Sequence, residues 1–152
     1  MPPQEGYVFA LDATKIKRYF PNLIQGKNFE FTSGQTDEYN CVAWATELTA
    51  DWVQFIYDEI GNYDNNVQKY IKYFTELGFI KTENSQFVKD VQKIAIYANE
   101  NKDFMHVARQ LNNGKWTSKL GEWEDIEHTT LEVLAGDSYG NPYIIMEKKN
   151  EI

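Results

Sequence analysis

The sequence predicts an α+β fold, in which N-terminal helices pack against an antiparallel β-meander. Two observations predict it. Up to Leu77 the apolar residues recur with helical spacing, most clearly at Val67, Tyr70, Phe74 and Leu77. Beyond residue 90 the period changes to two, and short turns separate the apolar stretches.

Length and composition favour one domain. The 152 residues include 42% hydrophobic and 15% aromatic side chains, which is enough for a packed core. We expect a single domain over residues 1–152, with 1–20 as a peripheral lead and 21–147 as the core. No internal repeat, low-complexity tract or linker interrupts this sequence.

The first part of the chain is expected to contain only short elements. A strand is expected at Tyr7–Ala10, and Asp12 can cap a brief helix that Pro21 ends. Residues 22–37 are rich in Gly, Thr, Ser and Asn, so we expect a loop there. Within this loop, Phe29–Thr32 can form a brief edge strand.

An apolar helix is predicted to begin at Cys41, the only cysteine of the chain, and to run to about Leu48. Cys41, Trp44 and Leu48 fall on one face of this helix. Either Asn40 or Asp37 can provide its N-cap.

The next helices complete the first half of the fold. The dense apolar stretch Asp51–Ile60 is expected to continue the helix after a kink, and Gly61–Asn65 is a turn cluster. The clearest helix is predicted over Val67–Leu77, because Gly78 stands where a C′ glycine ends a helix.

The second half is expected to form the sheet. Ile94 and Ile96 are predicted on one strand face, with Ala95 and Tyr97 on the other. The predicted segments are a polar loop at Thr82–Gln86, strands at Lys93–Tyr97, Phe104–Leu111 and Lys115–Leu120, a hairpin turn at Asn112–Gly114, a loop with at most one helical turn at Gly121–Leu134, and a last strand at Pro142–Glu147.

Charge and targeting signals exclude several classes of function. The 15 basic and 23 acidic residues give a net charge of −8, which disfavours binding to nucleic acid. The N-terminus lacks the basic and apolar regions of a signal peptide, and no apolar run is long enough to span a membrane. With a single cysteine, these features predict a cytoplasmic protein, or an effector exported without such a signal.

Cys41 is a candidate nucleophile. In the first turn of a helix, unpaired backbone N–H groups and the helix dipole favour a thiolate. The alternative is that Cys41 is a small buried apolar residue, because free cysteine is among the most buried residue types. A catalytic thiolate would need an imidazole within hydrogen-bond reach, at a separation of about 3–4 Å.

His106 is the stronger candidate for that imidazole, because a strand fixes a ring better than a loop does. It is expected to share a strand face with Phe104 and Ala108. Ser118 on the next strand, or Asp125, could orient the ring. The other histidine, His128, lies in an acidic segment and is expected to be a solvated loop residue or a cap.

An oxyanion site could be formed by the side chain of Gln35 and the backbone N–H of Cys41. Asn40, Trp44, Trp116 and His128 are further candidate binding residues. Neither a metal nor a cofactor is expected, because the closely spaced ligand pairs of a structural zinc site and a glycine-rich phosphate loop are absent from the sequence. A phosphatase-type loop is not expected either, because no arginine follows Cys41 closely.

A cysteine at a helix start, a histidine on a later strand and a polar residue on the following strand resemble the papain-like cysteine hydrolases. The spacing from His106 to Ser118 looks most like the NlpC-type branch. The chain is also similar, over about residues 20–147, to an uncharacterised bacterial domain family of that architecture. The stretches that carry this similarity are Phe20-Pro21-Asn22-Leu23, Thr32-Ser33, Tyr39-Asn40-Cys41-Val42-Ala43-Trp44-Ala45, Ile94-Ala95-Ile96-Tyr97-Ala98, His106-Val107-Ala108-Arg109-Gln110-Leu111, Gly114-Lys115-Trp116-Thr117-Ser118-Lys119-Leu120-Gly121, Asp125-Ile126-Glu127-His128 and Tyr139-Gly140.

The resemblance implies an acyl-thioester reaction, as in peptidases, amidases, deamidases and acyltransferases. Ser118 stands where relatives more often carry His, Asn, Gln or Asp, while Asp125 and His128 are both kept in the similar motif. The leading hypothesis is a thiol hydrolase that acts on a peptide, a protein or another amide. The alternatives are a protein-modifying effector or toxin domain, and a non-catalytic module whose partner groove is lined by Trp44, Trp52, Trp116 and Trp123. The sequence does not predict an oligomeric state.

Overall fold

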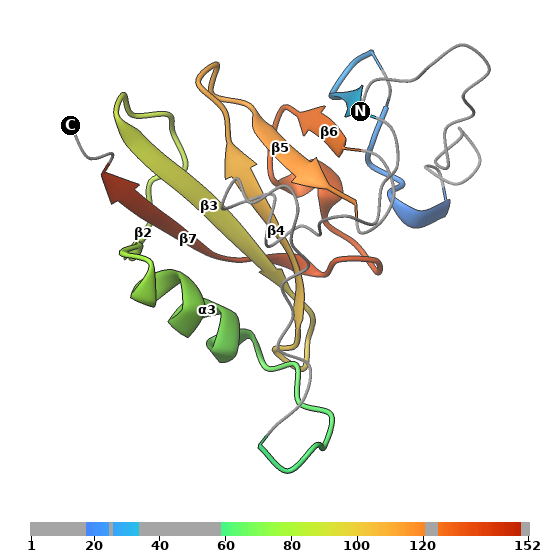
Figure 1. The fold of residues 1–152 in the computed structure, drawn as a ribbon. Helices are drawn as coiled ribbons and strands as arrows, with labels where there is room; N and C mark the ends of the chain where they lie inside the picture. Colours follow the sequence, from blue (N-terminus) through green and yellow to red (C-terminus); the bar gives the residue numbers. More distant parts are fainter. Residues whose placement is uncertain (1–17, 25, 34–58, 121–124, 150–152) are drawn as a thin grey trace.

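The computed structural model describes residues 18–24, 26–33, 59–120 and 125–149. In this part of the chain a seven-stranded sheet has the strand order β1-β6-β5-β4-β3-β7-β2, and each neighbouring pair is antiparallel. The helix α3 (Val67–Glu76) covers one face of the sheet near β3 and β7 (Figure 1). The architecture is therefore mixed α+β, as the sequence predicts.

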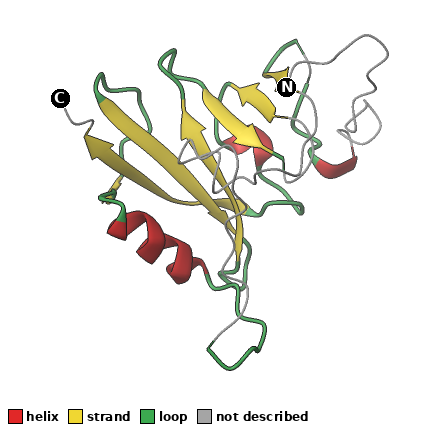
Figure 2. Ribbon diagram, in the orientation of Figure 1, coloured by secondary structure: helices red, strands yellow, loops and turns green. Residues whose placement is uncertain are grey.

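Figure 2 shows that strands dominate the described part of the chain. The strands are β1 (Phe29–Ser33), β2 (Ile80–Thr82), β3 (Val91–Ala98), β4 (Phe104–Gln110), β5 (Trp116–Lys119), β6 (Asp125–His128) and β7 (Asn141–Lys149), and a single 3-10 turn, η1, spans Glu132–Leu134. The meander predicted for the second half of the chain is confirmed in β3, β4 and β5. The edge strand predicted at Phe29–Thr32 is also confirmed, because β1 lies at one end of the sheet beside β6.

Helix α3 has the limits that its sequence predicts. At its start the side chain of Asn66 accepts a hydrogen bond from the backbone N–H of Gln68 at 2.8 Å. At its end Gly78 adopts φ +101°, and the backbone N–H of Phe79 returns to the carbonyl of Phe74. The side chains that α3 buries are Val67, Tyr70 and Phe74.

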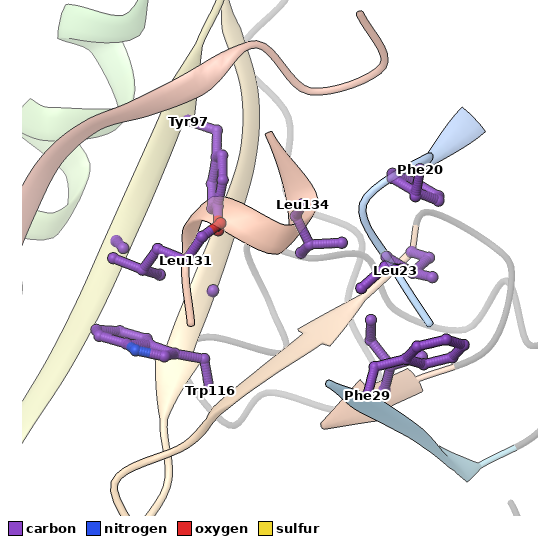
Figure 3. Close-up of a cluster of buried hydrophobic side chains, with 11 residues drawn as sticks. Phe20, Leu23, Phe29, Tyr97, Trp116, Leu131 and Leu134 are labelled. Carbon is purple, nitrogen blue, oxygen red and sulfur yellow. The ribbon is translucent and has the colours of Figure 1, made fainter. Parts of the chain in front are cut away.

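The two faces of the sheet carry separate apolar clusters. The α3-side cluster consists of Val67, Tyr70, Phe74, Phe79, Ile94, Ile96, Ala98, Phe104, Val107 and Met146. The second cluster, shown in Figure 3, consists of Phe20, Leu23, Phe29, Ala95, Tyr97, Ala108, Trp116, Leu120, Ile126, Leu131 and Leu134. The alternation predicted for β3 is confirmed, because Ile94 and Ile96 contribute to one cluster and Ala95 and Tyr97 to the other.

A β-bulge changes the predicted face of Phe104. Tyr97 of β3 pairs with His106, whereas the next residue, Ala98, pairs with Phe104, so Met105 is the extra residue on β4. Phe104 therefore packs in the α3-side cluster, where its ring stacks on Tyr70 at a centroid distance of 3.7 Å. The expectation that Phe104 and His106 share a face is wrong, whereas Ala108 does share the face of His106.

Two strands were not predicted: β6 lies in a segment that was expected to be a loop, and β2 overlaps the loop predicted at Thr82–Gln86 only at its last residue. β6 occupies Asp125–His128, within the loop predicted over Gly121–Leu134, and η1 is the helical turn expected there. β6 contains one apolar residue, Ile126, so hydrophobic alternation gives no strand signal. β2 has only three residues at the far edge of the sheet, and Ile80 in it is 65% exposed.

Several predictions fall outside the described residues. These are the strand at Tyr7–Ala10, most of the helix capped by Asp12, the helix that begins at Cys41 and nearly all of its continuation over Asp51–Ile60. Among the helical residues that the structure does describe, no helix has the length and apolar character needed to cross a membrane.

Candidate active site

His106 lies at the centre of the second face of the sheet, and its side chain is 0% exposed. β4 places it opposite Tyr97 of β3, whose ring centroid lies 5.4 Å away. The ring of Tyr139 stacks on the imidazole, with centroids 4.2 Å apart and an angle of 3° between the planes. Two aromatic rings therefore fix the plane of the imidazole.

A chain of hydrogen bonds runs from His106 through Ser118 to His128. Nε2 of His106 lies 2.9 Å from Oγ of Ser118, and the same Oγ lies 2.7 Å from Nε2 of His128. Nδ1 of His128 lies 2.9 Å from the carbonyl oxygen of Thr130. The three side chains meet because β4, β5 and β6 are consecutive neighbours in the sheet and because each of these side chains points to the same face of it.

The carbonyl of Thr130 determines the direction of this chain, since a carbonyl can only accept. Nδ1–H of His128 donates to it, and Nε2 of the neutral His128 ring is then an acceptor. The Ser118 hydroxyl therefore donates to His128, and its oxygen accepts from Nε2–H of His106. This leaves a lone pair on Nδ1 of His106.

Nδ1 of His106 is the unusual atom of the site. It is buried and has no hydrogen-bond partner in the part of the chain that the structure describes. A buried nitrogen acceptor without a partner loses its hydration and gains nothing in return. Such an atom is uncommon in a native fold, so Nδ1 of His106 is a candidate to interact with a further group.

Burial disfavours the protonated form of both rings. The pKa of His128 is lowered by burial to about 4, against smaller opposing effects of the Thr130 carbonyl and Glu127. Burial, with a smaller contribution from His128, also holds the pKa of His106 well below its ordinary value. The expectation that His128 is a solvated loop residue is wrong, because the ring lies on a strand and is 0% exposed.

Asp125 is not placed to orient His106. It lies opposite Lys119 in the β5–β6 register, and its carboxylate is 4.0 Å from Nζ of that residue. Its neighbour Ile126 packs in the second cluster, so alternation turns Asp125 toward the other face of the sheet. The structure thus brings together His106, Ser118 and His128, and leaves Asp125 apart.

The remaining candidates are either buried or outside the described residues. Trp116 is 3% exposed and packs in the second cluster, so it does not line an open groove. Cys41, Gln35, Asn40, Trp44, Trp52 and Trp123 lie outside the described residues. Within the described residues, no three His, Cys, Asp or Glu side chains gather as a metal ion would require.

Sequence reasoning assigned no role to Tyr139 or Thr130. Tyr139 is followed by Gly140, which adopts φ +70° and forms a bridge with Gly136. A Cβ on Gly140 would lie 2.2 Å from the carbonyl oxygen of Ala98, so only glycine fits here. The Tyr139-Gly140 dipeptide was the available signal, because it is one of the stretches that are similar to an uncharacterised bacterial domain family.

Replacing Gly140 with alanine is expected to lower the free energy of unfolding by about 2 kcal/mol more than the same replacement at Gly61. Both glycines have a positive φ, but a Cβ on Gly61 meets nothing within 4 Å. The matched pair therefore separates backbone strain from the clash with Ala98. Urea unfolding measures both values, and equal losses would show that the close approach at Gly140 is not required.

One comparison with known proteins gives a match. The family model described as "Domain of unknown function (DUF7689)" matches residues 30–147, which include Cys41 and the three side chains of the hydrogen-bond chain. No curated protein and no solved structure matches the chain. Because the model covers more than half of the sequence, the chain belongs to the DUF7689 family of domains of unknown function.

Proposed function

We propose that this protein is a papain-like thiol hydrolase that cleaves or transfers at an amide bond, with Cys41 as nucleophile and His106 as general base. The observation that carries the proposal is the lone pair on Nδ1 of His106, which is buried, fixed in direction and without a partner in the described residues. A general base needs such a lone pair, held in place by contacts to the other side of the ring.

The reaction would proceed in two steps. Nδ1 of His106 takes the proton of the Cys41 thiol, and the sulfur forms a bond to the carbonyl carbon of the substrate. His106 then gives that proton to the leaving amine as the C–N bond breaks, which leaves an acyl thioester on Cys41. Water hydrolyses the thioester with His106 again as base, or another nucleophile accepts the acyl group.

The proposed role of Ser118 is to orient the ring, and the hydrogen bond between Nε2 of His106 and Oγ of Ser118 supports it. The backbone N–H of Cys41 and the side chain of Gln35 are the proposed donors to the developing oxyanion. Peptide, protein or other amide compounds are the proposed substrates. The thiol must stay reduced, so we propose a reducing compartment such as the cytoplasm.

Because the pKa of His106 is low, its ring can be protonated during catalysis only if a negative charge lies nearby. Burial disfavours the imidazolium, so protonation of His106 requires a compensating anion nearby. The Cys41 thiolate would be this anion, and the two groups would then titrate as a coupled pair. The thiol would therefore ionise well below its ordinary pKa of about 8.5.

The test uses iodoacetamide, because Cys41 is the only cysteine and every label must lie on it. The midpoint of the rate–pH profile is expected below about pH 6.5, against about 8.5 for an ordinary thiol. Intact-mass spectrometry after each time point measures the extent of labelling. The proposal fails if the midpoint lies near that of a free thiol, or if Cys41 reacts only after denaturation.

A further inference from the structure

We propose that His128 is a positioning residue of this site, which acts through the Ser118 hydroxyl to hold His106 as the tautomer with a free Nδ1. This inference rests on the proposed function for its consequence in catalysis. Its structural part, the tautomers of the two rings, stands on the hydrogen bonds alone and is tested separately.

The Ser118 hydroxyl can donate to either of the two imidazole rings. Oγ lies within hydrogen-bond distance of Nε2 of both rings, and its single proton can point to only one of them. If the proton pointed to His106, Nε2 of that ring would have to be an acceptor. The proton of the neutral His106 ring would then sit on Nδ1, and the lone pair needed to take a proton would be lost.

The direction of the Ser118 proton is determined at the other end of this series of hydrogen bonds, where His128 contacts Thr130. Nδ1 of His128 lies 2.9 Å from the Thr130 carbonyl and must donate to it, since two acceptors at this distance repel. Nε2 of the neutral His128 is then an acceptor, and it draws the Ser118 proton away from His106. A group that does not touch His106 thus decides which nitrogen of His106 is protonated.

Burial strengthens the effect of His128 on the tautomer of His106. Ser118 and His128 are both 0% exposed, so water does not compete for the hydroxyl proton. The reversed chain would also leave a buried N–H on His106 instead of a lone pair, and unpaired buried N–H groups are rare in native structures. Asp125, the other candidate for this role, faces the opposite side of the sheet and pairs with Lys119.

The tautomers can be measured directly, because the chain contains only two histidines. The probe is ¹⁵N-histidine NMR at pH 7 on the full-length Cys41→Ser variant, which lacks the thiol that would protonate His106. We expect one ring protonated at Nε2, which is His106, and one at Nδ1, which is His128. Two rings with the same tautomer, or the reverse assignment, would overturn the inference.

Two matched variants test the role of His128. His128→Phe keeps a ring of similar size but removes the acceptor, and His128→Gln keeps an acceptor for Ser118 without the ring. In the Cys41→Ser background, His128→Phe is expected to move the His106 proton to Nδ1 in a large fraction of molecules. With Cys41 present, it is expected to raise the midpoint of the iodoacetamide profile by about one pH unit. In His128→Gln, the tautomer population of His106 and the alkylation midpoint are both expected to lie close to their values with His128 present.

A double-mutant cycle with Ser118→Ala completes the test. Since His128 acts through Ser118, changing His128 in the Ser118→Ala protein is expected to move the alkylation midpoint no further. Additive shifts would contradict the inference, and so would a His128→Phe protein that keeps the wild-type tautomer. If Cys41 of the wild type behaves as an ordinary thiol while the tautomers are as expected, the proposed function fails and the hydrogen-bond order stands. If His128→Phe does not fold, the wild-type tautomers and the His128→Gln cycle still decide.

Discussion

Replacing His106 with glutamine is expected to raise the midpoint of Cys41 alkylation from below about pH 6.5 to about 8.5. Glutamine can still donate to Oγ of Ser118, 2.9 Å from the native Nε2, but it cannot accept a proton from the thiol. At pH 6 an unassisted thiol is less than about 1% ionised, whereas a thiol paired with the imidazole would be mostly ionised. The thiolate fraction at that pH should therefore fall by about a hundredfold.

The midpoint is the right measure of this change, rather than the rate at one pH. A thiolate of lower pKa is also a weaker nucleophile, so rates understate the difference in ionisation. Ultraviolet absorbance of the thiolate, followed through the same pH range, gives an independent value. An unchanged midpoint in the His106→Gln protein would exclude His106 as the base.

A double variant with Lys119→Met and Asp125→Asn provides the matched control. It removes both members of the buried Lys119–Asp125 ion pair together, so neither charge is left without the other. It tests the alternative triad member directly, because a role of Asp125 in holding His106 would raise the alkylation midpoint. From the geometry we expect the midpoint to stay within about 0.3 pH units of the wild-type value.

The parts of the fold that could be predicted are those in which burial follows the apolar residues. Helix α3 and strand β3 present apolar side chains at the helical and the strand period, so the limits of α3 and the faces of both elements follow from the sequence. The site residues His106 and Ser118 could be placed on neighbouring strands for the same reason. The turn at Asn113-Gly114 joins β4 to β5 and fixes their register.

The parts of the fold and of the site that could not be predicted depend largely on buried polar side chains, which a pattern of apolar residues does not reveal. β6 buries Asp125 and His128 because each has a partner on another element, Lys119 for the first and Ser118 for the second. Without knowledge of those partners the segment reads as a charged loop. The bulge at Met105 has no sequence signal either, and it alone changes the face of Phe104.

Acidification is expected to destabilise the Cys41→Ser protein, in which no thiolate can pair with a protonated His106, by at least about 3 kcal/mol between pH 7 and pH 4 through its histidines. The pKa of His128 is about 4 in the folded protein and about 6.5 in the unfolded chain, so the unfolded state binds more protons between these values. The stabilisation is complete above about pH 6.5 and is lost as the pH falls toward 4. His106, whose pKa is also lowered, adds to the loss in the same direction.

Urea unfolding at pH 7, 6 and 5 measures this dependence, with a slope of about 1 kcal/mol per pH unit for each histidine below pH 6. Carboxylates also titrate near pH 4, so the control adds His106→Gln and His128→Gln to the same Cys41→Ser background and keeps every acidic residue. Its unfolding free energy is expected to change far less between pH 7 and pH 5 than that of the Cys41→Ser protein with both histidines. Equal pH dependence in the two proteins would mean that the rings are not held neutral by burial, and the tautomer assignments that depend on neutral rings would fail with them.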